Sequence, residues 1–344
     1  MKHTMIAVDV AKSVFEIAVS DRPGRVTERH RLSREVFLRF FAERQPATVL
    51  MEACGSAHHW GRQLQALRHE VLLLPPHRTR PYVTGNKTDR SDAKGLLEAQ
   101  RNEQIQPVPV KSLNQQALSA LHRLRSAWLA ARTGRINTVR GLLREFGFAI
   151  PLGAKRVVPI LQTLLEDADS GLPDSVRPAL NEARAEILEL ERRMRSIEFQ
   201  LRALARQIPV VHKLRTVPGV GLITATALVA FVGDVGRFPS ARHFASYLGL
   251  TPRERSSGLR RRLGAISKRG DVYIRMLLTH GARAVIWKAK SRKVLDRLRA
   301  WALRIEQHRG HNKAAIALAN KLARIVWAVW RRDVEFTEQV PEAA

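Results

Sequence analysis

The sequence predicts three parts: an α/β domain, a helical arm, and a basic, mostly helical C-terminal domain. Three observations predict this order. Short apolar runs alternate with helical patterns over residues 1–110, an apolar seam repeats every seven residues within 111–208, and helical patterns rich in Lys and Arg fill 209–344. These ranges are the domain boundaries that we expect.

The composition indicates a folded protein with a polyanionic partner. Of 344 residues, 59 are Lys or Arg and 31 are Asp or Glu, which gives a formal net charge of +28. With 45% hydrophobic residues, the chain is long and apolar enough to bury a sizeable core, so the basic excess does not describe a disordered tail. Nucleic acid is the leading candidate for the partner, because clustered Lys and Arg bind phosphates.

Other classes of protein are excluded by what the sequence lacks. No stretch approaches the ~18 apolar residues that cross a bilayer, so we expect no membrane partner. The N-terminus reaches Asp9 too soon for a secretory signal, and the single cysteine, Cys54, excludes an internal disulfide and a cysteine-based zinc site. We therefore expect a cytoplasmic protein.

The first part opens with a predicted β-hairpin, in which two apolar runs flank a turn of small and polar residues. Later strands alternate with helical patterns, which predicts parallel pairing after the hairpin. Ser33 stands where the N-cap of the first helix is expected. The expected strands cover residues 5–12, 15–19, 25–31, 48–52 and 71–74.

Four carboxylates stand out by position. Asp9 and Glu52 each end an apolar strand, and adjacent parallel strands would bring these ends together. Asp89 and Asp92 share one face if a helix begins there. Such a cluster binds hard divalent cations through oxygen, as phosphoryl-transfer enzymes require. Taken singly, Asp9 suits a turn, Glu52 a surface acid and Asp89 a helix cap; as an ordered set on a basic α/β frame they predict a metal site.

The helical arm has the most regular pattern in the chain. Apolar residues recur in alternating steps of four and three, which is a heptad seam. A less regular seam over 113–146 precedes it, and Gly171-Leu172-Pro173 separates the two. An antiparallel pair within one chain and a homodimeric coiled coil both fit, and a dimer or higher oligomer is expected. The seam consists of Val176, Leu180, Ala183, Ile187, Leu190, Met194, Ile197, Leu201, Leu204 and Ile208.

Two features of the third part predict contacts with nucleic acid. Pro218-Gly219-Val220-Gly221 lies between two helical patterns and resembles a helix-hairpin-helix element, where Gly219 and Gly221 would let backbone N–H groups approach a phosphate. The plainer interpretation is a tight helix connection without a ligand.

The second feature is the segment 253–275, which has eight basic residues against Glu254 and Asp271, a net +6. Duplex binding through it should weaken with salt, with a log–log slope of about −0.9 per phosphate. Few aromatic residues interleave, so base stacking on single strands is not the mode expected here. The eight are Arg253, Arg255, Arg260, Arg261, Arg262, Lys268, Arg269 and Arg275.

Together these motifs resemble those of the DEDD transposases of the IS110 family, including its IS1111 branch and the related Piv and MooV DNA invertases. The resemblance covers nearly the whole chain in the right order. In the first part it rests on the Asp9 hairpin, Met51-Glu52-Ala53 and Lys87-Thr88-Asp89-Arg90-Ser91-Asp92-Ala93. In the third it rests on Pro218-Gly219-Val220-Gly221, Tyr247-Leu248-Gly249-Leu250-Thr251-Pro252, Ser257-Gly258 and Ile266-Ser267-Lys268-Arg269-Gly270.

The resemblance implies an RuvC-like (RNase H-like) fold for residues 1–110 and a C-terminal transposase domain with a serine nucleophile. It implies that Mg²⁺ is held by Asp9, Glu52, Asp89 and Asp92. It also implies guidance by a structured non-coding RNA that pairs with target and donor DNA. The serine before glycine, Ser257, would attack the phosphodiester and form a covalent phosphoserine.

Chemistry alone does not separate Ser257 from Ser256, and only the Ser-Gly pattern favours Ser257. A serine hydroxyl is a poor nucleophile until a base or a metal activates it. The neighbouring arginines supply no base and would instead stabilise phosphate. Metal held by the carboxylates could activate the serine if the two domains meet, either within one chain or across a dimer.

The resulting expectation is a Mg²⁺-dependent, RNA-guided transposase that cleaves and rejoins DNA. Two alternatives remain open from the sequence. One is a metal-dependent, structure-selective nuclease of the junction-resolving type, in which water attacks and the serine is incidental. The other is a non-catalytic nucleic-acid-binding protein whose carboxylates are structural.

Overall fold

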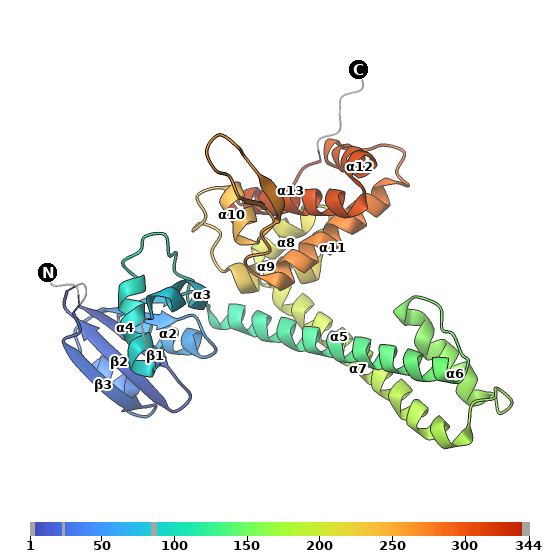
Figure 1. Ribbon diagram of the computed structural model, residues 1–344, viewed down its shortest axis with the longest axis horizontal. Coiled ribbons are helices and arrows are strands. Elements are labelled where there is room, and N and C mark those ends of the chain that lie inside the picture. Colours follow the sequence, from blue (N-terminus) through green and yellow to red (C-terminus); the bar gives the residue numbers. More distant parts are fainter. Residues whose placement is uncertain (1–3, 23–24, 84–87, 339–344) are drawn as a thin grey trace. The chain divides into compact units, whose positions relative to one another are not determined.

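The chain forms two compact units, residues 1–114 and 115–344. The computed structural model describes residues 4–22, 25–83 and 88–338 (Figure 1). No helix of the described ranges is both long and apolar enough to cross a membrane.

The first unit is built on a five-stranded mixed sheet with the strand order β3-β2-β1-β4-β5. The pairs β1–β2 and β2–β3 are antiparallel, whereas β1–β4 and β4–β5 are parallel. The predicted α/β class, with an opening hairpin followed by parallel strands, is confirmed. The strands are β1 (Met5–Val10), β2 (Val14–Ser20), β3 (Glu28–Ser33), β4 (Thr48–Glu52) and β5 (Glu70–Leu74).

Helices cover both faces of this sheet, because side chains alternate between its faces along each strand (Figure 1). On one face, large residues such as Phe15 pack against α1 (Phe37–Ala42) and α2 (Ala57–Ala66). On the other face, the small side chains of Ala7 and Ala18 pack against α4 (Asp89–Ala99). The short helices α3 (Pro76–Thr79) and η1 (Arg80–Tyr82) lie between β5 and α4.

One predicted helix start is wrong. Ser33 is the last residue of β3, and α1 begins after Val36, which makes no side-chain cap hydrogen bond. The third strand extends further than its sequence suggests, because Val14 pairs with Ser33 at the end of the β2–β3 ladder.

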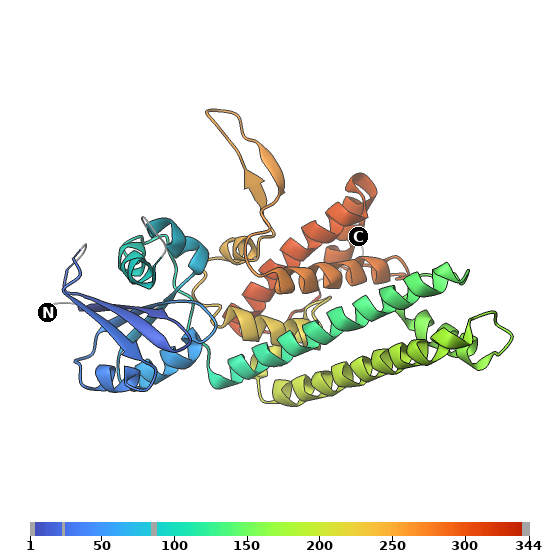
Figure 2. The ribbon, with the colours of Figure 1, turned by 60° about the horizontal axis from the view of Figure 1, so that its bottom comes forward.

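The arm of the second unit pairs two long helices in an antiparallel sense (Figures 1 and 2). Ion pairs join Arg125 to Glu198 and Arg132 to Glu191, so residue numbers rise along one helix as they fall along the other. The pairing seen is thus within one chain, and pairing between chains stays a prediction. The elements are α5 (Leu113–Glu145), η2 (Ala154–Arg156), α6 (Val157–Glu166), η3 (Asp174–Val176) and α7 (Arg177–Arg206).

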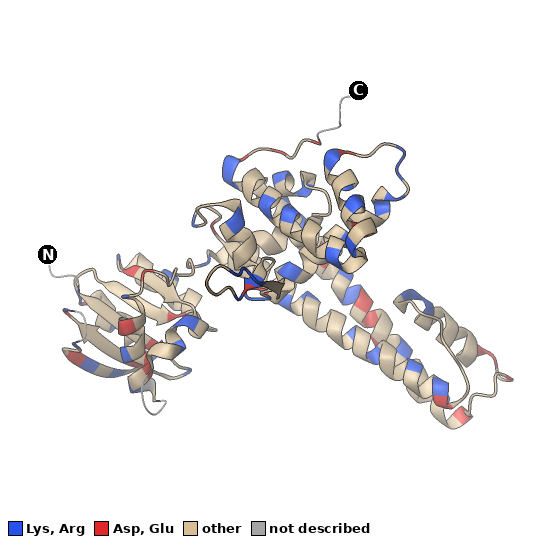
Figure 3. Ribbon diagram, turned by 45° about the horizontal axis from the view of Figure 1, so that its top comes forward, with Lys and Arg blue, Asp and Glu red and all other residues tan. Residues whose placement is uncertain are grey.

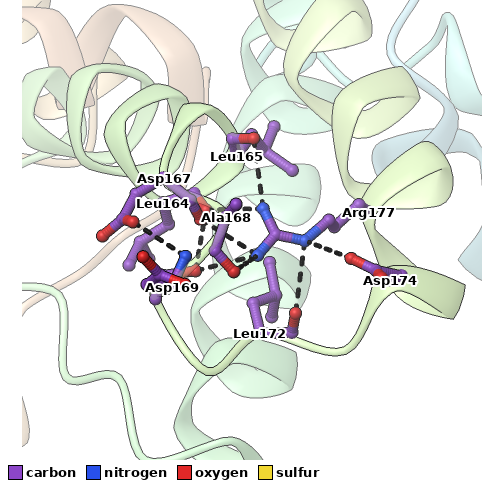
Figure 4. Close-up of polar contacts among 9 residues, drawn as sticks. Leu164, Leu165, Asp167, Ala168, Asp169, Leu172, Asp174 and Arg177 are labelled. Atoms are coloured by element: carbon purple, nitrogen blue, oxygen red, sulfur yellow. Dashed lines mark hydrogen bonds and ion pairs between the residues drawn. The ribbon is translucent and has the colours of Figure 1, made fainter.

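Arg177 organises the turn at the tip of the arm (Figure 4). Its guanidinium donates hydrogen bonds to the carbonyl oxygens of Leu164 at 3.2 Å and Leu165 at 3.1 Å, near the C-terminus of α6. It also bonds the Leu172 carbonyl at 3.2 Å and pairs with Asp174 at 3.1 Å. One side chain therefore satisfies carbonyls that the end of α6 leaves open and fixes the start of α7.

The remainder of the second unit is mostly helical, with one small β-hairpin, and shares a single apolar core. Helices α9, α11 and α13 supply much of this core, and α10 and α12 pack on α13. The elements are α8 (Pro209–Thr216), α9 (Leu222–Val232), α10 (Ala241–Tyr247), β6 (Pro252–Glu254), β7 (Leu263–Ile266), α11 (Val272–Ala289), α12 (Arg297–Arg309) and α13 (His311–Arg332).

The Pro-Gly-x-Gly segment connects α8 to α9, and packing accounts for its first glycine. Gly219 has φ +79°, and a Cβ there would lie 2.7 Å from the carbonyl oxygen of Gly281 in α11. Close helix approach therefore requires glycine at this position. The contacts of Gly219 and Gly221 with DNA stay a prediction.

Candidate functional site

Strand register brings Asp9 and Glu52 together at one edge of the sheet of the first unit. The last parallel pair between β1 and β4 is Val8 with Met51, so Asp9 and Glu52 follow at the same level. Because side chains alternate, both carboxylates belong to the face that packs against α4. The expectation that neighbouring strand ends bring these two residues together agrees with this register.

The third carboxylate comes from α4, which begins at Asp89. Thr88 is the N-cap: its Oγ1 accepts from the Ser91 N–H at 3.2 Å, and Ser91 Oγ accepts from the Thr88 N–H at 3.0 Å. This reciprocal capping box fixes the helix start, so Asp89 is not the cap. The Asp89 side chain lies outside the described part of the structure.

Asp9, Glu52 and Asp92 line one cavity of about 590 Å³. This is a shared site for three of the four predicted acids. The other described residues that line the cavity are Pro76, His77, Thr79, Arg80, Val83 and Leu96. Among them, Arg80 carries a positive charge that can bind a phosphate.

The donor set fits a hard divalent cation, because all three side chains offer carboxylate oxygens. The three carboxylates do not, however, form a complete coordination shell around one ion. Among the described residues, no group of three or more His, Cys, Asp or Glu side chains is gathered closely enough to hold one ion. The three carboxylates therefore share a cavity without surrounding a single point.

Sequence reasoning missed two residues beside these acids. Thr79 is buried, and its hydroxyl lies 3.0 Å from the Pro76 carbonyl and 3.3 Å from Glu52 Oε1, so it can orient that carboxylate. Glu16 is the cross-strand partner of Asp9, and its Oε2 is buried without a hydrogen-bond partner among the described atoms. The hairpin pattern could have revealed Glu16, whereas no local pattern identifies Thr79.

The serine pair of the second unit lies on the β6–β7 hairpin, which projects from the helices (Figure 2). Two glycines allow the ends of the hairpin to cross closely. Gly249 has φ +71°, and a Cβ there would lie 1.9 Å from the Arg269 carbonyl oxygen. Gly270 has φ +88° and approaches the Tyr247 carbonyl in the same way. The glycines of both motifs therefore define the base of the hairpin.

The hairpin gives the two serines different surroundings. The Ser256 hydroxyl donates to Glu254 Oε1 at 2.8 Å and accepts from the Arg262 N–H at 3.1 Å. The backbone of Ser257 instead pairs with Arg260, at 3.3 and 3.2 Å. Sequence reasoning weighed only the neighbouring arginines and missed Glu254, which accepts a hydrogen bond from Ser256.

Glu254 is a weak base in this arrangement. The Ser256 hydrogen bond, followed by the charge of Arg261, holds the pKa of Glu254 below its usual value. Such a carboxylate orients the Ser256 hydroxyl more readily than it removes the proton.

Basic residues surround the serines along the exposed hairpin (Figure 3). Arg261 forms an ion pair with Glu254 at 3.2 Å. The other predicted nucleic-acid contacts of this segment are also exposed, so their charges face solvent. They are Arg253, Arg255, Arg260, Arg262, Lys268 and Arg269.

Two family models match the chain. Residues 6–148 match the model of DEDD transposases of the IS110 type, described as "Transposase". Residues 211–296 match the model described as "Transposase IS116/IS110/IS902 family". The first range contains all four predicted acids, and the second contains both serines.

Full-length relatives agree with these models. A "Probable family 20 transposase" of Pseudomonas aeruginosa is 42% identical over 97% of this chain and 98% of its own length. The "Transposase for insertion sequence element IS1111A" of Coxiella burnetii is 36% identical over 96% and 90%. The IS1328 transposase of Yersinia enterocolitica is 34% identical over 97% and 99%. The chain therefore belongs to the IS110 family of insertion-sequence transposases.

Proposed function

We propose that this chain is a Mg²⁺-dependent recombinase that moves an insertion sequence by cleaving and rejoining DNA. The observation that supports this most is the cavity shared by Asp9, Glu52 and Asp92 in a transposase of the DEDD type. Three acids from β1, β4 and α4 lining one cavity exceed what turn or surface roles would require. The binding-protein alternative gives no reason for this convergence.

The metal-holding residues of the proposal are Asp9, Glu52 and Asp92, joined by Asp89. Bound Mg²⁺ would polarise a phosphodiester and make a hydroxyl nucleophile easier to deprotonate. Thr79 would keep Glu52 oriented, and Arg80 on the cavity wall would attract the DNA phosphate.

Ser257 is the proposed nucleophile, with Ser256 as the alternative. Its Oγ forms a new ester bond to phosphorus while a backbone P–O bond of the DNA breaks, and the released DNA hydroxyl takes up a proton. The reverse reaction on another strand frees the serine and reseals the DNA. The exposed arginines of the hairpin would neutralise the negative charge that develops on the phosphate.

The remaining proposals concern partners. A structured non-coding guide RNA is consistent with the formal net charge of +28, which suits a chain that contacts several nucleic-acid strands. Recombination also has to hold several DNA ends, which suits a homodimer or tetramer. Recovery of a discrete RNA with the expressed element checks the guide, and its absence from an active preparation contradicts guidance.

Serine substitutions test the proposed chemistry. Ser257→Ala should abolish strand exchange and any covalent protein–DNA adduct, because the phosphoserine cannot form. Ser256→Ala is the matched control and should retain the adduct. The measurement is a denaturing gel of labelled element DNA after incubation with each protein.

Two results would require a different assignment. If adducts persist in Ser257→Ala and disappear in Ser256→Ala, then Ser256 is the nucleophile. If both variants retain full cleavage without any adduct, water attacks and the junction-nuclease alternative is correct.

A further inference from the structure

A groove of about 1050 Å³ lies at the base of the serine hairpin, between β7 and helix α13. One wall is formed by Gly264, Ala265 and Ile266 of the hairpin. The opposite wall is a stripe of α13 that includes Ile316 and Ala317, with polar residues one turn before and after them. The groove therefore lies within the second unit and is separate from the carboxylate cavity.

The groove combines apolar walls with positive charge. Lys313, Lys321 and Arg324 line it, and none of its described lining residues is acidic. None of these three cations forms an ion pair with a carboxylate of the described residues. Lys313 and Arg324 are exposed and Lys321 is partly buried, so the three cations beside apolar surface favour an anionic ligand that also has apolar faces.

Lys321 is the one of these three cations that is partly buried. Its ammonium lies 4.2 Å from the centre of the Trp301 ring, a cation–π contact. Burial, and then the neighbouring Arg324, lower the pKa of Lys321. An anion bound here would offset both effects.

The walls are also fixed in place. The Asn320 side chain donates to the Leu250 carbonyl at 3.1 Å, which ties α13 to the segment that enters the hairpin. Trp301 packs against the main apolar core of the unit. On the side of α13, a ligand would therefore meet a preformed surface.

We propose that this groove binds unpaired nucleotides of a single-stranded nucleic acid, with bases against Ile266 and Ile316 and phosphates on Lys313 and Arg324. Duplex DNA presents stacked bases and a phosphate exterior, so it has no use for apolar walls of this kind. An unpaired strand exposes base faces together with phosphates. The absence of acidic side chains among the described lining residues disfavours a basic protein segment.

This binding site deepens the proposed function and rests on it for the kind of ligand. The hairpin that forms one wall also carries Ser256 and Ser257, near the turn at its other end. The expectation that base stacking on single strands is not the mode of binding concerned the segment 253–275 alone, whereas the groove also takes Trp301 from α12 and residues from α13.

Binding of labelled oligonucleotides tests the groove without requiring catalysis. The full chain is titrated in EDTA against fluorescein-labelled 12-nucleotide thymidylate and a 12-base-pair duplex, followed by anisotropy. Ala317→Phe fills the groove without changing charge and should weaken single-strand binding by about tenfold while leaving duplex binding unchanged. Thermal unfolding of the variant confirms that it is folded.

A variant that removes positive charge from the groove provides a second test. Lys313→Gln with Arg324→Gln should weaken single-strand binding and reduce its salt slope by about 0.7 for each phosphate that is no longer neutralised. The matched control is Arg202→Gln with Arg206→Gln, two exposed residues of α7, which removes the same charge elsewhere. The control should bind the single strand more tightly than the groove variant.

Three results would overturn the proposal. Unchanged single-strand binding by folded Ala317→Phe shows that the groove is not used, and equal weakening by the two charge variants shows only general attraction. A change in oligomeric state without a change in single-strand binding assigns the groove to a protein partner. Because the titrations are made in EDTA, these outcomes are independent of whether the serine and the carboxylates support recombination.

Discussion

At the scale of single residues, the carboxylate cavity depends on a neighbour as well as on the acids. Thr79 is buried and lies within hydrogen-bond distance of Glu52, the last residue of β4. Residues that orient metal-binding carboxylates affect metal affinity nearly as much as the ligands themselves. Thr79 is the last residue of the short helix α3, which follows Pro75. Nothing in this part of the sequence indicates that its hydroxyl contacts Glu52.

Replacement of this hydroxyl tests its role. Thr79→Val keeps the buried volume but removes the donor to Glu52, so the Mg²⁺ concentration for half-maximal DNA cleavage should rise roughly tenfold. Thr79→Ser retains the hydroxyl and should behave like the unmodified protein. Mg²⁺ titrations of cleavage measure the difference, and overlapping curves for the Val and Ser variants would show that Thr79 is only a packing residue.

The different surroundings of Ser256 and Ser257 could not be predicted from the sequence. From sequence, Ser256 and Ser257 are equivalent apart from the following glycine. Glu254 lies only two residues from Ser256, but the Arg262 N–H that also bonds the Ser256 hydroxyl comes from across the β6–β7 hairpin. These short, exposed strands do not have the apolar alternation that identifies β1 or β4, so this second partner of Ser256 was not predictable from local chemistry.

At the level of secondary-structure elements, the periodicity of apolar residues correctly predicted several strands and helices. The opening hairpin, the buried strand that ends at Glu52 and the helix that begins at Asp89 all lie where their patterns placed them. Ser33 failed as a cap because strand pairing extends through it. The apolar seam of α7 predicted the burial of residues such as Ile187 and Leu201. The sequence did not show which helix packs against this seam, and the structure identifies it as α5.

A buried histidine connects three elements of the second unit. His122 of α5 lies 3.0 Å from Tyr273 Oη of α11 and 3.0 Å from Thr226 Oγ1 of α9. Burial, and then the charge of Arg125, lower the pKa of His122 from 6.5 to about 4. The folded protein thus holds this ring neutral at physiological pH, and α5 stays joined to the helical core.

This histidine should make stability fall in acid. The unfolded chain takes up a proton near pH 6.5 and the folded chain only near pH 4, so the stabilisation is complete above pH 6.5. It should be lost progressively from pH 6.5 down to 4, by a total on the order of 3 kcal/mol.

Comparison with His122→Gln isolates the contribution. The unfolding free energy of each protein is measured by helical circular dichroism in denaturant from pH 7 to 4.5. The stability advantage of the unmodified protein should shrink as the pH falls. A difference that is independent of pH would mean that His122 does not titrate as its burial requires.

At the level of the whole molecule, the net positive charge and the family membership both indicate a nucleic-acid partner. A formal net charge of +28 predicted a polyanion, and the chain proved to be an IS110-family transposase. The α/β class and the order of the motifs could be predicted from one sequence. The cavity lining and the groove could not, because each joins segments far apart in the chain, and the hairpin geometry could not, because its strands are short and exposed.

We propose that the serine of the second unit reacts only when the carboxylates of the first unit hold Mg²⁺. The most direct test is adduct formation by Asp9→Asn, expressed with the complete element and supplied with labelled element DNA. The unmodified protein should form a covalent serine–DNA adduct with Mg²⁺ and none in EDTA. Asp9→Asn should bind the DNA equally well and form no adduct, whereas an adduct formed at the unmodified rate would show that the serine reacts without this carboxylate.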